Sequence, residues 1–204
     1  MDILHSIRDA LLEAQDVLNR FIENPENIAT IAETAEMMQD VFERQGRIFT
    51  CGNGGSLCDA VHFAEECTGK FREDRRPLPA IALSDAGHIT CTANDFGFAE
   101  VFARPLSALG HRGDLLVVLS TSGNSENVVR AAATAKSRRM QVFGLLGGDG
   151  GDLKQHCDIC LIVPGNTADR IQEIHIKVLH ILIEHVERLM FPDNYSGLTQ
   201  RALL

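Results

Sequence analysis

The fold is decided by Leu115-Leu-Val-Val-Leu-Ser-Thr-Ser-Gly-Asn-Ser-Glu-Asn-Val-Val-Arg130. The stretch begins with an uninterrupted apolar run, which is typical of a strand buried on both faces of a parallel sheet. Residues 120–125 then carry a hydroxyl or amide side chain at every position except one glycine. From Glu126 the spacing of apolar residues predicts a helix, with Asn124 or Ser125 as its N-cap.

A strand that delivers a hydroxyl-rich loop to a helix N-terminus is suited to binding an anion. Free backbone N–H groups, the positive end of the helix dipole and several O–H donors then point to one place. The spacing matches neither the Walker lysine loop nor the dinucleotide fingerprint. An ordinary capped turn would explain one or two Ser or Thr residues but not this density. We therefore predict a phosphate site in residues 120–125.

Strand–loop–helix repeats extend from this stretch in both directions. Apolar or β-branched runs predict strands at 47–51, 80–83, 115–119, 141–146 and 159–163. Helical patterns follow at 56–68, 86–93, 99–109, 125–138 and 152–156, and a long helix is expected at 168–190. This alternation predicts an α/β fold for residues 47–190, a three-layer α-β-α sandwich around a five-stranded parallel sheet. Ligands of such sheets bind beyond the carboxyl ends of the strands.

The segments outside this domain have a different character. Two amphipathic helical patterns occupy residues 1–46, separated by an N-cap at Asn24 and a proline at position 25, and the second is expected to end with Gly46 at C′. They predict a helical hairpin that packs on the core or on another subunit. Their broad apolar stripes predict an oligomer, most simply a homotetramer. Residues 191–204 are expected to form a C-terminal tail.

Composition limits the class of protein and its partners. The 204 residues suit one domain with a full core, and the net charge of −9 argues against nucleic acid or an anionic membrane as the main partner. The N-terminus lacks the pattern of a secretory signal, and residues 174–191 carry charges at helical spacing, so they predict a buried helix rather than a membrane span. The six cysteines lie along predicted core elements, which favours reduced thiols in a cytoplasmic protein.

Two further segments carry candidate chemistry. Three glycines in residues 51–56 allow close backbone approach to a ligand, and Ser56 is expected to cap the following helix. His62 and Glu66 are spaced i, i+4, so they share one helix face and can meet one ion or substrate; a solvated pair is the plain alternative.

The last helix offers Gln172 and His180. Their angular offset is about 80°, so both can reach one site from a broad face. His175 and His185 remain alternatives on spacing alone.

Taken together, the motifs resemble a known family. Cys51-Gly-Asn-Gly-Gly-Ser56, His62-Phe-Ala-Glu-Glu66, Asn94-Asp-Phe-Gly-Phe98, Ser120-Thr-Ser-Gly-Asn-Ser125 and Arg170-Ile-Gln-Glu-Ile-His-Ile-Lys177 occur in this order. In this combination the chain resembles the phosphoheptose isomerases of the sugar isomerase (SIS) family. The resemblance implies a cytoplasmic homotetramer with active sites at subunit interfaces. It also implies the isomerisation of sedoheptulose 7-phosphate to D-glycero-D-manno-heptose 7-phosphate, the first step toward nucleotide-activated heptoses of bacterial surface glycans.

The resemblance also assigns roles by position. The implied zinc ligands are His62, Glu66, Gln172 and His180. The implied contacts to the sugar phosphate are Asn53, Gly54, Gly55, Ser56, Asn94, Asp95, Ser120, Thr121, Ser122, Ser125 and Gln172.

These residue types suit the implied reaction. Moving a carbonyl from C2 to C1 through an enediol needs a base, an acid and a group that stabilises the enediolate oxygens. Glu66 is the expected base and His180 the expected acid, and zinc would polarise the carbonyl. A group that binds zinc tightly carries protons less readily, so the two roles compete.

A non-catalytic protein is the alternative to an isomerase. The SIS family also contains a non-catalytic adaptor that binds the replication initiator protein, but an adaptor has no need for Glu66, Asp95 and His180 together.

The basic cluster of Lys70, Arg72, Arg75 and Arg76 is expected to be a solvated loop rather than a phosphate attractor.

Overall fold

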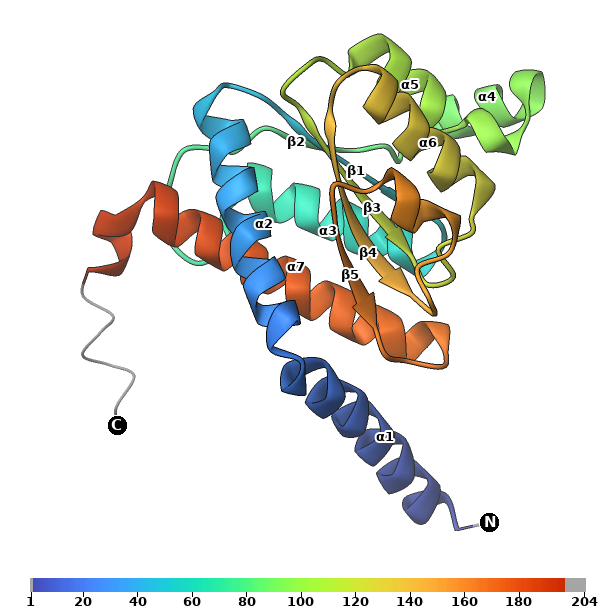
Figure 1. Cartoon of the computed structure of the whole chain (residues 1–204), viewed down its shortest axis with the longest axis vertical. Helices are drawn as coiled ribbons and strands as arrows, with labels where there is room; N and C mark the ends of the chain where they lie inside the picture. The colour runs from blue at the N-terminus through green and yellow to red at the C-terminus, as the bar shows by residue number, and fades with distance from the viewer. Residues whose placement is uncertain (1, 197–204) are drawn as a thin grey trace.

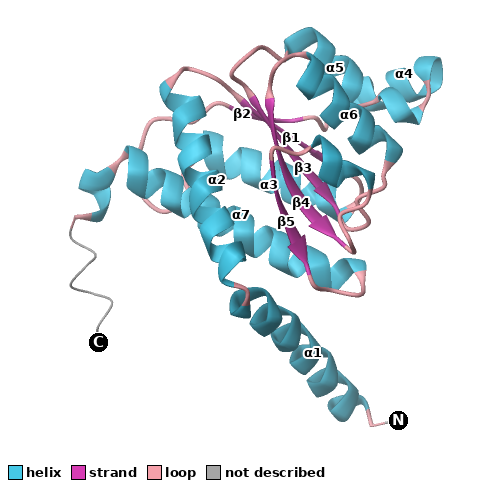
Figure 2. Cartoon of the chain, viewed as in Figure 1, coloured by secondary structure: helices cyan, strands magenta, loops and turns pink. Residues whose placement is uncertain are grey.

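Five parallel strands form the centre of the molecule (Figures 1 and 2). They are β1 (Ile48–Gly52), β2 (Ala80–Ala82), β3 (Leu115–Ser120), β4 (Gln141–Gly147) and β5 (Ile159–Val163). Their spatial order is β2-β1-β3-β4-β5, and every pairing is parallel. The computed structural model describes residues 2–196 of the chain.

The middle strand, β3, is buried along its whole length. Its first residue, Leu115, pairs with Ile48 of β1 and with Gln141 of β4. A strand flanked on both sides and covered on both faces leaves no solvated position, which is why its sequence is an apolar run rather than an alternating one. β1 and β3 each end one residue later than expected, at Gly52 and Ser120, so the polar loops begin directly at the edge of the sheet.

Helices cover both faces of the sheet, which confirms the predicted three-layer sandwich (Figure 2). One layer contains α2 (Pro25–Glu43), α3 (Gly55–Thr68) and α7 (Ala168–Met190). The other contains α4 (Ala86–Phe96), α5 (Ala103–Leu109) and α6 (Glu126–Ser137). Short 3-10 turns lie at Phe98–Glu100, Asp152–His156 and Pro192–Tyr195. Within residues 2–196, no helix combines the length and the apolar character needed to cross a bilayer.

The two N-terminal helices are present but do not fold back on each other. The helix α1 (Ile3–Glu23) ends at Asn24, whose side chain accepts the Glu26 N–H group and caps α2, with Pro25 at the first helical position. A single connecting residue is too short for the loop of a helical hairpin. The expected hairpin is therefore replaced by an extended pair in which α1 projects from the domain (Figure 1).

The end of α2 differs from the expected glycine cap. The left-handed residue is Gln45 (φ 61°), and its N–H group binds the Phe42 carbonyl at 3.1 Å. The next N–H group, on Gly46, binds the Val41 carbonyl at 2.8 Å, which completes a Schellman motif one residue earlier than predicted. Glycine is needed at position 46 for space, because a Cβ atom there would lie 2.7 Å from the carbonyl oxygen of Gly113.

The cysteines agree with the expectation of reduced thiols, since all six are free. Cys157 and Cys160, which form a C-x-x-C pattern, are both partly buried. Burial raises the pKa of Cys157 to about 12, which disfavours the thiolate that metal binding or disulfide exchange requires.

Part of the predicted tail belongs to the packed structure. The turn at Pro192–Tyr195 returns to α7, where the Tyr195 hydroxyl donates a hydrogen bond to Glu187, and the Tyr195 side chain is buried. Residues 197–204 of the expected tail lie outside the described residues.

His175, one of the alternative site histidines, is a core residue instead. Its side chain on α7 is fully buried, and Nε2–H donates a hydrogen bond of 3.2 Å to the Leu146 carbonyl. Burial lowers the pKa of His175 to about 4, because a charged imidazolium would lose its hydration.

This lowered pKa predicts an acid-dependent loss of stability. Between pH 6.5 and about 4 the unfolded chain binds a proton at His175 that the folded chain does not bind. The free energy of unfolding is therefore at its full value above this pH range and falls as the pH drops through it. The loss should reach roughly 3 kcal/mol. Urea unfolding at pH 7 and pH 4.5 should show a smaller pH dependence for His175→Gln than for the wild type. The exposed His185→Gln should keep the wild-type dependence, and equal dependence in all three proteins would contradict the assignment.

Candidate functional site

The candidate site lies where the sheet reverses its winding. β1 and β3 are neighbours, but the helix that follows β1 covers one face of the sheet and the helix that follows β3 covers the other. The two loops therefore separate at the edge of the sheet, an arrangement that typically leaves a ligand crevice. Asn53 in the first loop and Asn127 at the start of α6 exchange two amide hydrogen bonds of 2.9 and 2.8 Å, which tie the two sides together.

The hydroxyl-rich loop is shaped from within by its own side chains. The buried Ser120 Oγ accepts the Gly123 N–H group at 3.1 Å and lies 3.5 Å from Ser125 Oγ. Ser122 Oγ accepts the Asn124 N–H group at 3.2 Å. Ser125 is the N-cap residue of α6, as predicted, but its side chain makes no capping bond. The Val128 N–H group binds Asn127 Oδ1 at 3.0 Å. Within the described residues, the N–H groups of Glu126 and Asn127 have no side-chain partner that would compete with an anion.

Gly123 is required where the hydroxyl-rich loop meets the loop that follows β4. Its φ is 67°, and a Cβ atom there would lie 2.1 Å from the carbonyl oxygen of Gly150. The next residue, Asn124, accepts the Asp152 N–H group at 3.0 Å. Thr121 is partly exposed and Ser122 is exposed, so the outer hydroxyls of the loop are accessible to a ligand.

The glycine-rich loop after β1 differs from expectation in one respect. Helix α3 starts at Gly55 with Gly54 (φ 56°) as its N-cap, so Ser56 is not the capping residue. The left-handed conformation of Gly54 lets the helix begin one residue early. Ser56 is buried instead, and its Oγ accepts a 3.3 Å hydrogen bond from the amide of Gln172 on α7. A Cβ atom on Gly55 would lie 2.6 Å from Gln172 Oε1, so a side chain there would displace this amide.

Three potential metal ligands gather further along the same two helices. His62 and Glu66 on α3 and His180 on α7 each offer one ligand atom, and these atoms lie within 4.8 Å of one another. His62 Nε2 is 3.1 Å from Glu66 Oε1. The His62 and His180 rings meet edge to face, with centroids 5.0 Å apart. We refer to these three residues as the His–Glu–His cluster.

The electrostatics of the cluster suit a divalent cation. Burial, and to a lesser degree the neighbouring His62, lowers the pKa of His180, so the ring keeps a free lone pair near neutral pH. Burial also raises the pKa of Asp59, one turn before His62, to about 6. Two imidazoles and a carboxylate are donors that zinc prefers, so the residues present fit such an ion.

Other expected site residues lie apart from the cluster. Gln172 precedes His180 by about 12 Å along the helix axis, and within the described residues its amide bonds to Ser56 rather than to the cluster. Asn94 and Asp95 are exposed in the last turn of α4, in the layer on the opposite face of the sheet. Their side chains bond to each other, with Asn94 Nδ2 donating to Asp95 Oδ1 at 2.7 Å.

Two residues near the site were not expected from the sequence. Asn127 joins the two loops, and nothing in its local sequence, directly after Glu126, distinguishes it. Phe71 lies with its ring centroid 5.8 Å from that of His180, and it comes from the segment interpreted as a solvated loop. Both contacts connect segments that are far apart in the chain, so no local spacing indicates them.

Comparisons with known sequences give a consistent result. Residues 11–147 match the family model of the SIS domain. A phosphoheptose isomerase from Fusobacterium nucleatum is 51% identical over 180 residues, which cover 88% of this chain and 93% of that protein. A phosphoheptose isomerase from Escherichia coli is 50% identical over 185 residues, covering 90% of this chain and 96% of that protein.

Solved structures give the same picture. A phosphoheptose isomerase from Francisella tularensis superposes with a TM-score of 0.88 at 35% identity, covering 92% of this chain and 100% of that chain. The phosphoheptose isomerase of Neisseria gonorrhoeae has a TM-score of 0.85 at 36% identity, covering 91% and 98% of the two chains.

The loop geometry predicts that removing two hydroxyls will weaken anion binding. In a Ser120→Ala, Ser125→Ala double variant, the affinity for a sugar phosphate should fall by roughly 10²-fold or more, because each of the two hydrogen bonds to a charged group contributes about 1.5–3 kcal/mol. Calorimetric titration measures the affinity, and thermal melting checks that the variant is folded. Ser137→Ala, at the far end of α6, is the matched control. Unchanged affinity in a folded double variant would exclude this loop as the phosphate site.

Proposed function

The chain belongs to the phosphoheptose isomerases of the SIS-domain family, and we propose that it interconverts sedoheptulose 7-phosphate and D-glycero-D-manno-heptose 7-phosphate. The reaction would be the first step toward nucleotide-activated heptoses for bacterial surface glycans. The observation that carries the proposal is the His–Glu–His cluster, which offers acid–base and metal-binding groups in one place. Incubation with sedoheptulose 7-phosphate, with and without a chelator, followed by separation of the heptose phosphates, tests it directly.

Substrate binding is assigned to the two loops at the edge of the sheet. Ser120, Thr121, Ser122 and Ser125 would hold the 7-phosphate at the N-terminus of α6. The sugar hydroxyls would contact Asn53, Gly54, Gly55, Ser56, Asn94, Asp95 and Gln172. Since Asn94 and Asp95 lie on the opposite layer from the cluster, their part in binding requires a substrate that extends past the edge of the sheet or lies between subunits.

The isomerisation moves one proton between neighbouring carbons through an enediol. Glu66 is the proposed base, because its carboxylate is mostly buried and oriented by His62 at 3.1 Å. His180 is the proposed acid, and it reaches the same place from α7.

Zinc is the proposed metal, held by His62, Glu66 and His180. Gln172 is the proposed fourth ligand, and this role would require its amide to leave Ser56 and to approach the cluster, from which it lies apart. When bound, zinc would polarise the substrate carbonyl and stabilise negative charge on the adjacent oxygens.

The adaptor alternative is not supported. The similar relatives are isomerases rather than adaptors, and the cluster combines groups that simple protein binding does not require.

The roles of Glu66 and His180 predict a specific pattern of turnover. Glu66→Gln and His180→Gln should each lower kcat by roughly 10²-fold, the usual scale for a positioned proton carrier. Substrate should still bind, because the hydroxyl-rich loop is unchanged. Steady-state assays and calorimetry separate the two effects.

Glu65→Gln is the matched control. Position 65 is about 100° away from position 66 around the helix, so this variant should keep nearly the wild-type kcat. If Glu66 and His180 act only as metal ligands, excess zinc should restore much of the activity. A Glu66→Gln enzyme with near-normal turnover, or a Glu65→Gln enzyme that is inactive, would overturn the mechanism.

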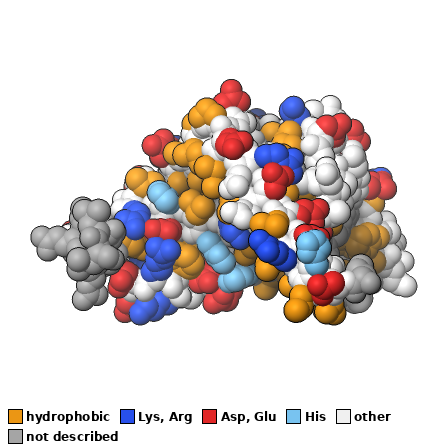
Figure 3. Space-filling model, turned by 90° about the horizontal axis from the view of Figure 1, so that it is seen from below, with side chains coloured by type: hydrophobic (Ala, Val, Ile, Leu, Met, Phe, Trp, Pro, Cys, Tyr) orange, Lys and Arg blue, Asp and Glu red, His pale blue; other side chains and the backbone are white. Residues whose placement is uncertain are grey.

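We also propose that the protein is a cytoplasmic homotetramer with active sites at subunit interfaces. Leu4 and Leu11 on α1 are 74% and 68% exposed, and Ile3, Ile7 and Leu12 are exposed beside them. Only Val17 and Phe21 of this helix are buried. Apolar side chains also gather in patches on the face shown in Figure 3. An exposed apolar stripe of this length favours burial against other subunits.

This proposal predicts a loss of assembly when the stripe becomes charged. Light scattering should give the mass of a tetramer for the wild type and a lower mass for the Leu4→Lys, Leu11→Lys double variant. Two lysines buried in the subunit interface would have no counter-charge, so burying them is unfavourable. Leu109→Lys, an exposed position on α5, is the control and should not change the mass. A wild-type protein that stays monomeric at micromolar concentration would refute the proposal.

A further inference from the structure

The proposed site is divided between two helices that run in the same direction. His62 and Glu66 lie on α3, whereas Gln172 and His180 lie on α7. Near the N-termini of both helices, the Gln172 amide bonds to Ser56. The function of the cluster thus depends on how the C-terminal half of α3 is held against α7.

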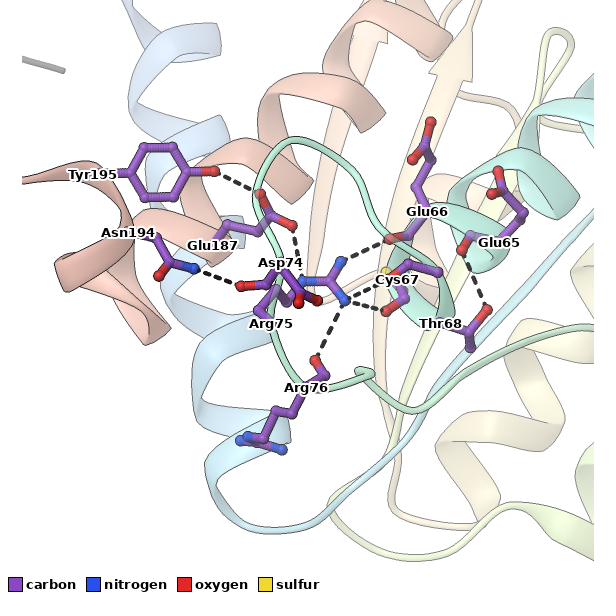
Figure 4. A network of polar contacts seen from close by, with 11 residues as sticks. Glu65, Glu66, Cys67, Thr68, Asp74, Arg75, Arg76, Glu187, Asn194 and Tyr195 are labelled. Carbon is purple, nitrogen blue, oxygen red and sulfur yellow. Dashed lines mark hydrogen bonds and ion pairs between the residues drawn. The ribbon is translucent and has the colours of Figure 1, made fainter. Parts of the chain in front are cut away.

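Arg75 binds the C-terminal half of α3. It lies in the loop after α3, and its side chain is fully buried, as is that of its partner Glu187 on α7. Arg75 Nε donates to Glu187 Oε1 at 2.8 Å, and Arg75 Nη2 donates to the backbone carbonyl of Glu66 at 2.7 Å. Nη1 donates to the carbonyls of Cys67 and Gly69 at 2.8 and 3.0 Å (Figure 4). The expectation of a solvated basic loop is therefore wrong for Arg75.

The C-terminal turn completes the arrangement. Tyr195 donates its hydroxyl proton to Glu187 Oε2, the carboxylate oxygen that Arg75 does not use (Figure 4). Burial raises the pKa of Tyr195, so the hydroxyl stays protonated and acts as the donor. The turn is itself anchored, because Asn194 Nδ2 donates to the Asp74 carbonyl at 2.9 Å. Residues 192–195 thus reach the loop that carries Arg75.

Such a buried ion pair is poorly explained by stability alone. Desolvation of two charges offsets most of their attraction, and apolar side chains of similar volume often stabilise a core as well or better. A guanidinium directed at the last carbonyls of α3 does something that an apolar group cannot, because it binds the free carbonyls and the negative end of the helix dipole. Glu187 follows His180 by about two turns, so it lies on the same side of α7.

We propose that Arg75, Glu187 and Tyr195 are positioning residues, which set the separation between Glu66 on α3 and His180 on α7. Arg75 fixes the main chain of Glu66 itself, Glu187 connects that point to the helix of His180, and Tyr195 keeps the Glu187 carboxylate in place. The C-terminal turn is then part of the active-site framework. This inference rests on the proposed roles of Glu66 and His180 at the metal and in proton transfer.

The test uses two graded substitutions in the full-length protein. Glu187→Gln keeps the shape of the side chain but leaves Arg75 without its counter-charge, and Tyr195→Phe removes only one hydroxyl. Zinc affinity is measured by competition with a chromophoric chelator, and kcat and KM are measured with sedoheptulose 7-phosphate. For Glu187→Gln we expect zinc affinity and kcat each to fall by roughly tenfold or more, the scale known for residues that orient metal ligands. KM should change less than twofold, because the hydroxyl-rich loop is intact.

Asp114→Asn is the matched control for lost stability. Asp114 is also a buried carboxylate, but it accepts the N–H groups of Arg47 and His111, which lie in neither α3 nor α7. It should lower the melting temperature and leave zinc affinity and kcat unchanged. The proposal is overturned if Glu187→Gln lowers the melting temperature in the same way but keeps wild-type zinc affinity and kcat.

Tyr195→Phe decides the question if Glu187→Gln does not fold. A several-fold loss of zinc affinity in this variant supports the positioning role, and wild-type affinity together with wild-type kcat overturns it. A wild-type protein that binds zinc but does not isomerise sedoheptulose 7-phosphate would instead refute the proposed function. The zinc measurements would still show whether these residues position the cluster.

Discussion

β3 is buried at every position, and this burial determines where polar residues can appear in the sheet. A strand with neighbours on both sides and helices on both faces must be apolar throughout, and its first polar residue can appear only where it leaves the sheet. That residue is Ser120, which begins the hydroxyl-rich loop. Because β1 lies directly beside β3 and its helix leaves to the other face, the two polar loops must separate at this edge. Core packing and the position of the hydroxyl-rich loop thus have one cause.

The elements with a strong local signal were predictable from the sequence. β5 and α7 begin and end at the expected residues, since an apolar run and a long amphipathic period leave little choice. Two of the errors occurred where distant segments compete for a position. Gln45 takes the left-handed conformation because Gly46 is needed against Gly113, and Ser56 is drawn to Gln172 rather than capping its helix. The Arg75–Glu187 pair joins residues that the chain separates by more than a hundred positions, and no spacing rule relates them.

At the candidate site, too, local spacing predicted only part of the arrangement. The i, i+4 spacing of His62 and Glu66 predicted a shared face, and the side chains do meet at 3.1 Å. Choosing His180 over His175 depended on the family resemblance, whereas the structure distinguishes them physically. His175 is turned into the core, where its ring donates to Leu146, and His180 faces His62. Around the helix, His175 lies near the middle of the buried face, between Val178 and Leu179, whereas His180 lies just beyond the edge of that face.

The parallel course of the helices has an electrostatic consequence. α3, α6 and α7 all begin just beyond the carboxyl end of a strand, so the positive poles of three peptide dipoles gather at one rim of the domain. This potential comes from the backbone and requires no lysine or arginine at the rim. It does not titrate, and charge-changing mutations on the surface cannot remove it. A chain with a net charge of −9 can in this way attract a dianion locally while repelling polyanions elsewhere on its surface.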